Sequence, residues 1–340
     1  MHDDAHSFLT QVTLAVDAIV SPVYAVGGCV RDTLLGRPVH DYDFTTPVPP
    51  DQVERAVREA GRHPYLAGKR FGTVGFKLPP DAMRALVGLP QDPAPDTPQP
   101  PALFVEVTTF RSEEYQPDSR KPLVSFGTSL VEDLSRRDFT INALAFDGRE
   151  VHDPFDGEKD LERKVVRAVG DPVARLSEDP LRTLRAARFA AQLGFSVDPE
   201  LAAAMEKTRV RLATVSHERW LIEMDKLLAA PHADAGLELL RECGVLRLII
   251  PEAASLALVC GSNAWEETLR RVQAAPQTPE ARWAALLGCC GQAAGAQEPD
   301  EACEVSIEVA HRTGYGLRWS KARHQAVEQL IRERGADTAR

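Results

Sequence analysis

Residues 23–46 have the sequence VYAVGGCVRDTLLGRPVHDYDFTT, and this stretch decides the fold of the first half of the chain. It opens on a short apolar strand that runs into Gly27-Gly28, and residues 29–36 then predict a helical turn closed by a glycine. Residues 40–45 alternate polar and apolar side chains, which is typical of a half-buried strand. A strand, a glycine turn, a helix and a second strand therefore follow one another.

Outward from this stretch the periodicity predicts further elements, namely helices over 7–20 and 52–61 and strands over 72–78 and 103–110. Between the last two strands, Pro79 to Pro101 holds eight of the chain's 25 prolines, and proline at that density indicates a surface insertion. From about Leu161 onward strand signals vanish and helical spacing remains. We expect an α+β head (1–160), a helical neck (161–230) and a helical body (231–340).

Composition is that of a globular protein, with 44% hydrophobic and 26% charged residues in a chain long enough for two or more folding units. No apolar stretch is long enough to span a membrane, and the N-terminus lacks a secretion signal. The six cysteines show no zinc spacing, so we expect reduced thiols in a cytoplasm. The net charge of −10 argues against nonspecific binding of nucleic acid but allows a locally basic groove. Nothing in the sequence indicates an obligate protein partner.

Two carboxylates are the first candidates for chemistry. Asp41 and Asp43 stand two apart in a predicted strand, so both side chains face one side while Tyr42 faces the core. Glu106 is a third candidate, because the valines on either side of it turn it outward. Adjacent carboxylates repel unless a cation lies between them, and Mg²⁺ prefers such oxygen ligands. Alone, a D-x-D pair is more often a solvated face; its context changes that interpretation.

That context is the strand–glycine–helix junction upstream. Gly27 and Gly28 allow backbone N–H groups to approach a phosphate closely, and Arg31 can add charge-assisted hydrogen bonds to it. A phosphate-binding turn thirteen residues before an acidic pair predicts a nucleotidyl-transfer site.

Five segments, in order, resemble the motifs of bacterial class II tRNA nucleotidyltransferases: GGCVRDTLLGR, HDYDFTT, VEVTTFR, RRDFTINALAFD and EDPLRTLRAARF. This is the CCA-adding enzyme family, in the polymerase-β superfamily and related to bacterial poly(A) polymerases. The similarity covers roughly residues 15–255. It implies a polymerase-β-like head with a mixed sheet, followed by an all-α neck and body.

The resemblance also implies roles for individual residues. Asp41 and Asp43 would hold magnesium, and Gly28 and Arg31 would bind nucleotide phosphates. Arg137 would contact the nucleotide, with Asp138 and Asn142 helping on the ribose side. The base pocket would be lined by Asp179, Arg182, Arg185 and Arg188.

The residues around Asp179 are consistent with this assignment. Ser177 to Pro180 predicts a helix start, and three arginines then recur every third residue on one face. On its own, such a stripe is more often a solvated helix face. An aspartate acceptor beside an arginine donor matches the Watson–Crick edges of cytosine and adenine and mismatches those of uracil and guanine.

The implied reaction is attack of a tRNA 3′-hydroxyl on the α-phosphate of CTP or ATP, with Asp41 and Asp43 bridging two Mg²⁺ ions and Glu106 completing the set. Tyr115 to Thr128 resembles the family's flexible loop, which favours CCA or A-only over CC-only addition. Phe71 stands where the family usually has His, and residues 256–340 match poorly, which indicates a shortened body. The alternatives are an A-only or CC-only enzyme, a poly(A) polymerase, and a noncatalytic tRNA-binding paralogue.

Overall fold

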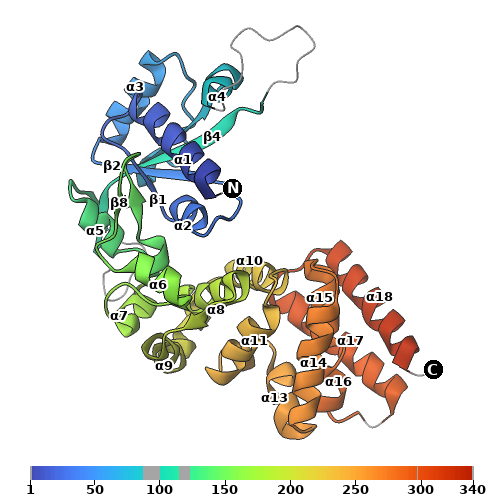
Figure 1. Ribbon diagram of the computed structural model, residues 1–340. Coiled ribbons are helices and arrows are strands. Elements are labelled where there is room, and N and C mark those ends of the chain that lie inside the picture. Colours follow the sequence, from blue (N-terminus) through green and yellow to red (C-terminus); the bar gives the residue numbers. More distant parts are fainter. Residues whose placement is uncertain (1, 87–99, 115–122, 297, 339–340) are drawn as a thin grey trace, which may run out of the picture. The chain divides into compact units, whose positions relative to one another are not determined.

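The computed structural model describes residues 2–86, 100–114, 123–296 and 298–338. The chain divides into two compact units, one made of residues 1–163 and 167–170 and the other of residues 164–166 and 171–340 (Figure 1). Each unit has its own buried interior, and each is described by itself below.

The first unit is built on a six-stranded mixed sheet with the strand order β3-β4-β2-β1-β7-β8. The strands are β1 (Tyr24–Val26), β2 (Tyr42–Thr46), β3 (Thr73–Leu78), β4 (Leu103–Thr109), β7 (Ala145–Phe146) and β8 (Val151–His152). Only the β2–β4 pair within this sheet is parallel. The four strands expected from the sequence are present, with ends shifted by one or two residues.

Helices flank this sheet: α1 (His2–Asp17), α2 (Gly28–Leu34), α3 (Pro50–Glu59), α4 (Pro80–Leu86), α5 (Leu130–Ser135) and α6 (Gly157–Arg163), with short 3-10 turns η1 (Lys69–Phe71) and η2 (Thr140–Asn142). α3 shows why the sequence folds this way. It starts with proline at its first position, where no N–H is needed, and buries Val53 and Val57 one turn apart.

The proline-rich segment differs from the expectation of a plain surface insertion. Its beginning forms the helix α4, because Pro80 occupies the first helical turn, where proline is tolerated, and Met83 is buried. The rest of the predicted insertion, residues 87–99, lies outside the described residues. The predicted flexible loop starts within the hairpin of β5 (Arg111–Glu114) and β6 (Leu123–Phe126), and its residues 115–122 also lie outside them.

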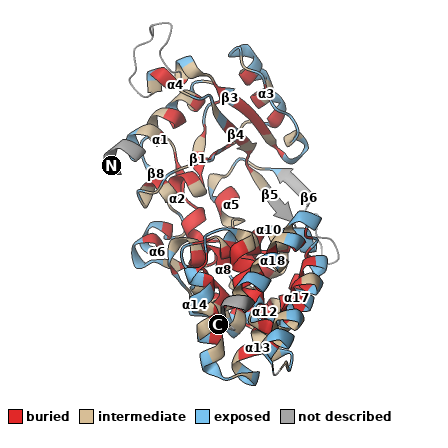
Figure 2. Cartoon of the chain, turned by 90° about the vertical axis from the view of Figure 1, so that its right-hand side faces the viewer, coloured by how far each residue is buried: buried red, intermediate tan, exposed pale blue. Residues whose placement is uncertain are grey.

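Among its described residues, the second unit is helical apart from one small sheet. Its α-helices are α7 (Pro172–Glu178), α8 (Arg182–Leu193), α9 (Pro199–Thr208), α10 (His217–Leu228), α11 (Ala233–Glu242), α12 (Leu246–Ile249), α13 (Pro251–Val259), α14 (Ser262–Ala274), α15 (Pro279–Leu287), α16 (Cys290–Ala293), α17 (Pro299–Gly316) and α18 (Lys321–Thr338), with a 3-10 turn η3 (Arg209–Thr214). Figure 2 shows buried residues concentrated along α8, whose Leu184 is fully enclosed.

The prediction that no strands follow Leu161 was wrong in one place. β9 (Val165–Val166) and β10 (Ser196–Val197) form a two-stranded parallel sheet. Two-residue strands carry no periodic signal, and their pairing depends on the tertiary fold that brings them together. Otherwise the predicted fold class, an α+β head with a mixed sheet followed by an all-α region, is confirmed.

Candidate active site

Three carboxylates lie near one another on one side of the sheet of the first unit. Asp43 lies in β2, and its partner across the parallel β2–β4 pair is Glu106. Asp41 lies one residue before β2. All three are exposed, whereas Tyr42 and Phe44 are buried on the other side. The alternation predicted from the sequence is therefore present.

Negative charge predominates around Asp43. The pKa of Asp43 is raised above its ordinary value, first by desolvation and then by the negative charge of Glu106, with a smaller contribution from Asp41. The guanidinium of Arg137 acts in the opposite direction but does not cancel the shift. A set of oxygen donors that repel one another in this way fits a divalent cation, whose charge would stabilise all three carboxylates.

The glycine turn stands next to β2. β1 ends at Val26, and Gly27 follows with a φ of 73°, a conformation that favours glycine. A Cβ atom on Gly27 would lie 3.1 Å from Nη1 of Arg137, and one on Gly28 would lie 3.7 Å from Nη2 of Arg31. The missing side chains thus leave room for two guanidinium groups to converge on the turn, which makes it a local cationic site.

Three of the predicted nucleotide-binding residues form one hydrogen-bonded chain. Nη1 of Arg31 donates to Oδ1 of Asn142 at 2.6 Å, and Nδ2 of Asn142 donates to Oδ1 of Asp138 at 3.0 Å. Arg31 also holds Asp32 through two hydrogen bonds of 3.0 and 2.8 Å. All three predicted residues are buried. The structure therefore brings Arg31, Asp138 and Asn142 together and fixes the arginine from two sides.

A buried aspartate that the sequence analysis did not select supports Arg137. Oδ1 of Asp133 accepts hydrogen bonds from Arg136 at 2.7 and 3.1 Å and from the backbone of Arg111 at 3.3 Å. Its Oδ2 accepts from Oγ1 of Thr45 at 3.2 Å and pairs with Nη2 of Arg137 at 3.5 Å. Burial alone would raise the pKa of Asp133, but Arg136 and Arg137 outweigh it and hold that pKa below its usual value. The spacing of four residues between Asp133 and Arg137 is the signal in the sequence that could have revealed this pair.

In the second unit, the expected helix start at Ser177 to Pro180 is instead a junction. α7 ends at Glu178, and α8 begins at Arg182. Asp179 shapes the connection: its Oδ1 accepts from the backbone N–H of Leu181 at 3.2 Å, while its Oδ2 pairs with Arg219 at 3.4 Å. The sequence placed the break correctly but missed that a helix precedes it as well.

The arginine stripe on α8 is not a solvated face. Arg182 and Arg188 are each only 8% exposed, and Arg185 is half-buried. Nη1 of Arg182 donates to Oε2 of Glu178 at 2.9 Å and to the carbonyl of Arg175 at 3.0 Å. The side chain of Arg182 is thus held by Glu178 rather than by Asp179.

The far end of the stripe packs against an aromatic ring. The guanidinium carbons of Arg188 and Arg185 lie 4.1 and 5.5 Å from the ring centroid of Phe189. Nε of Arg188 lies 2.6 Å from Oε2 of the buried Glu223 on α10. Glu178 and Glu223, neither selected from sequence, therefore fix two of the predicted base-pocket arginines.

One compact group of metal-type ligands is present among the described residues. Ligand atoms of Asp147, Glu150 and His152 lie within 4.8 Å of one another. Oδ1 of Asp147 accepts from the backbone N–H groups of Arg149 and Glu150, and its Oδ2 lies 3.1 Å from Nε2 of His152. These bonds close the turn between β7 and β8, so the group is explained as a turn. The carboxylate oxygens of Asp41, Asp43 and Glu106 do not form a group within that distance.

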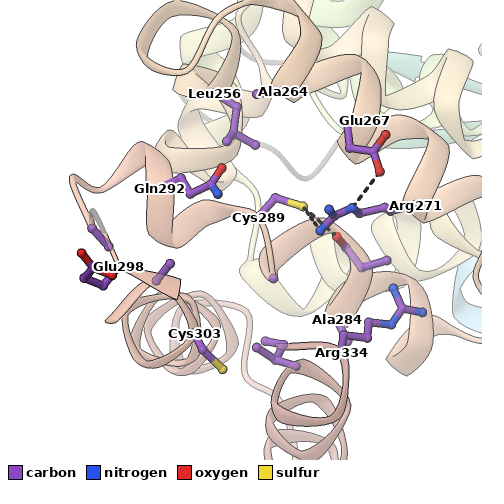
Figure 3. Close-up of a pocket in the computed structure, with 15 residues that line it drawn as sticks. Leu256, Ala264, Glu267, Arg271, Ala284, Cys289, Gln292, Glu298, Cys303 and Arg334 are labelled. Carbon is purple, nitrogen blue, oxygen red and sulfur yellow. Dashed lines mark hydrogen bonds and ion pairs between the residues drawn. The ribbon is translucent and has the colours of Figure 1, made fainter. Parts of the chain in front are cut away.

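A cavity of about 310 Å³ lies among the helices of the second unit (Figure 3). Arg271, Cys289 and Cys303 are among its lining residues, and Nη1 of Arg271 lies 3.6 Å from Sγ of Cys289. None of the predicted site residues lines it. The six cysteines are free. No helix in the described part of the chain has both the length and the apolar character needed to cross a membrane.

Comparison with known proteins finds a family match in each unit. Residues 23–167 match the poly A polymerase head domain, and residues 194–256 match the probable RNA and SrmB-binding site of polymerase A. The CCA-adding enzyme of Bacillus pumilus (strain SAFR-032) is 43% identical over 219 residues, which are 64% of this chain and 48% of that protein. The CCA-adding enzyme of Geobacillus thermodenitrificans (strain NG80-2) is 39% identical over 275 residues, 79% of this chain and 59% of that protein.

The fold agrees with a solved relative. The crystal structure of the Bacillus stearothermophilus CCA-adding enzyme in complex with CTP matches with a TM-score of 0.59 at 27% identity, covering 98% of this chain and 82% of that one. The chain spans about half the length of the curated relatives it matches. On these matches, the chain combines a poly A polymerase head domain with the polymerase RNA-binding region, and it is similar over both to the CCA-adding enzymes.

Proposed function

We propose that this chain adds C and/or A from CTP and ATP to the 3′ end of tRNA without a template, by Mg²⁺-dependent nucleotidyl transfer. One observation carries the proposal: Asp43 and Glu106 are cross-strand partners, and the guanidinium of Arg137 both acts on Asp43 and borders the Gly27 turn. A carboxylate set for metal and a cationic turn for phosphates are thereby joined in one unit. The CCA-adding relatives support the choice of tRNA, CTP and ATP.

Asp41 and Asp43 would hold the magnesium, with Glu106 beside them, and the bound metal would supply charge for activating the 3′-hydroxyl and stabilising the leaving pyrophosphate. The other groups belong to the chain itself. The Gly27-Gly28 turn admits the triphosphate, and Arg31 and Arg137 neutralise its charge. Because Asn142 and Asp138 already fix Arg31, little of its motion remains to be lost when a nucleotide binds.

The base would be selected in the helical unit, which we propose to divide into a neck (161–230) and a body (231–340). Asp179 would accept from the amino group of cytosine or adenine, and Arg182 would donate to the neighbouring ring nitrogen. Arg185 and Arg188, stacked against Phe189, would shape the pocket. The free cysteines support the further proposal that the protein works in the cytoplasm.

The test is incubation with tRNAs that end at the discriminator base, at C or at CC, each with CTP, ATP or both. A full enzyme extends all three to CCA. An A-only enzyme extends only the CC end, a CC-only enzyme stops before A, and a poly(A) polymerase adds long runs from ATP alone.

A matched variant checks the chemistry. Asp43→Ala should abolish addition by every nucleotide while the protein remains folded, because the side chain is exposed and contributes ligands rather than packing. Turnover by Asp43→Ala near the wild-type rate, or failure of the wild type to extend any of the three ends, would refute the proposed function.

A further inference from the structure

One row of residues crosses the sheet of the first unit. Asp43 on β2 pairs with Glu106 on β4, and Glu106 pairs with Gly75 on β3. Beyond β3, Tyr65 forms a bridge with Gly75 through hydrogen bonds of 2.7 and 3.0 Å. Directly paired residues project to the same face of a sheet. Tyr65 therefore stands on the face of the acidic residues, two strand spacings, roughly 10 Å, from Glu106.

The position between them is filled by an aromatic ring from the next residue along that face of β4. A Cβ atom on Gly75 would lie 2.6 Å from Cζ of Phe104, so the ring of Phe104 covers the glycine. It meets the ring of Tyr65 edge to face, with centroids 5.4 Å apart, and His63 meets Tyr65 at 5.6 Å. We name His63, Tyr65 and Phe104 the aromatic shelf. β3 and β4 are antiparallel neighbours in the sheet and run side by side in Figure 2.

The aromatic shelf is open to solvent although it is apolar. Tyr65 is 43% exposed and Phe104 41% exposed. Lys77, the cross-strand partner of Phe104, is exposed on the same face. Open aromatic rings beside a cation are the combination with which proteins hold single-stranded nucleic acid, the rings stacking on bases and the cation pairing with phosphates.

The sheet order decides which part of the reaction this face would serve. β2, with Asp43, has β1 on one side and β4 on the other. The glycine turn follows β1, and Arg137 and Asn142 precede β7, so the groups suited to the triphosphate lie on the β1 side. The aromatic shelf lies on the opposite side, beyond Glu106. With a phosphate held at the turn, the proposed reaction would bring the attacking 3′-hydroxyl in from this opposite side.

We infer that the aromatic shelf stacks the terminal base of the RNA 3′ end, with Lys77 at its backbone phosphate; the inference rests on the proposed function. Stacking suits this end because its identity changes with every nucleotide added. A contact that every base can make holds each successive end, whereas hydrogen-bond readout would favour only one of them.

The test uses the full chain and a tRNA ending in C, with 2-aminopurine in place of the terminal base for fluorescence. The wild type should quench the fluorophore on binding. Tyr65→Ala should remove the quenching and raise the KM for RNA about 5- to 150-fold, leaving the KM for the nucleotide near the wild-type value. Tyr65→Phe, which keeps the ring, should restore both. Leu66→Ala, a neighbouring exposed position, is the matched control and should change neither.

A second arm makes the result independent of folding defects. An RNA whose last nucleotide lacks its base should bind the wild type as weakly as the intact RNA binds Tyr65→Ala, and combining the two changes should cost little more than either alone. Full additivity, or unchanged RNA KM and quenching in Tyr65→Ala, overturns the inference while wild-type extension leaves the proposed function standing. Loss of extension by the wild type itself refutes the proposed function instead.

Discussion

Asp133 offers a sharp test of how the first unit is held together. Its carboxylate is 1% exposed and ties α5 to β2 through Thr45, to β5 through the backbone of Arg111, and to Arg136 and Arg137. Asp133→Asn keeps the shape but removes the charge. Breaking a buried pair costs about 3–5 kcal/mol when the partner is left buried. Arg136 and Arg137 retain some exposure and can be hydrated, so we expect a loss of about 2 kcal/mol in the free energy of unfolding at pH 7.

The pH dependence of this loss follows from the lowered pKa of Asp133. A carboxyl whose pKa is lower in the folded state stabilises the protein above its unfolded pKa, about 3.9, and this stabilisation disappears as the pH falls through the folded value. The difference between wild type and Asp133→Asn should therefore be constant from pH 7 to pH 5 and shrink below pH 4. Urea unfolding at a series of pH values measures it.

The same change should slow catalysis, because Asp133 positions Arg137 at the Gly27 turn. Small displacements of a charged group cost up to about 100-fold in rate, so we expect kcat to fall about 10- to 100-fold with CTP and ATP alike. Glu132→Gln, an exposed neighbour on α5, is the control. Wild-type stability and kcat in Asp133→Asn would refute the argument that this carboxylate organises the site.

Three further outcomes are expected. Asp179→Ala should lower the ratio of CTP to UTP incorporation by roughly five- to 150-fold, corresponding to contacts of about 1–3 kcal/mol. Arg31→Ala should weaken the incorporation of both nucleotides equally. If Asp179→Ala also weakens both equally, the role of Asp179 is limited to its structural hydrogen bond with the backbone of Leu181. Arg282→Leu should cost about 3 kcal/mol or more in urea unfolding, because its guanidinium is 1% exposed and donates to the carbonyls of Leu228 and Ala230; a smaller loss for Arg282→Lys is the control. Burial and then the nearby His311 lower the pKa of His324, so stability should fall as the pH drops below about 6.5 and level off beneath the folded pKa, a slope that His324→Gln should reduce.

Local patterns were sufficient for the parts of the fold that depend on local geometry. The two-residue period of β2 placed Asp41 and Asp43 on the open face and Tyr42 in the core, and the flanking valines did the same for Glu106. Gly27 indicated the turn, because glycine is the residue that readily adopts the positive φ found at this position. These inferences need no knowledge of what lies across the sheet.

Several features that sequence analysis missed depend on pairing between residues far apart in the chain. Glu106 faces Asp43 because β2 and β4 run parallel, and Tyr65 joins their row through the bridge to Gly75. No periodicity within a single strand contains that register. Glu223 likewise meets Arg188 only because α8 and α10 pack together. The burial of a single acidic residue cannot be recognised from the sequence, since Asp and Glu are far more often exposed.

Two arginines of the helical unit already have carboxylate partners. Arg182 pairs with Glu178, and Arg219 pairs with Asp179. In its proposed role, Asp179 is thus already satisfied before a base arrives, and an incoming base competes with Arg219 for its oxygen. An amino group is a donor and can take that place, whereas the carbonyl oxygen of uracil cannot, so uracil would lose hydration and gain no bond. Arg219 therefore improves the discrimination between bases, because a correct base must offer Asp179 a hydrogen-bond donor that can replace the guanidinium.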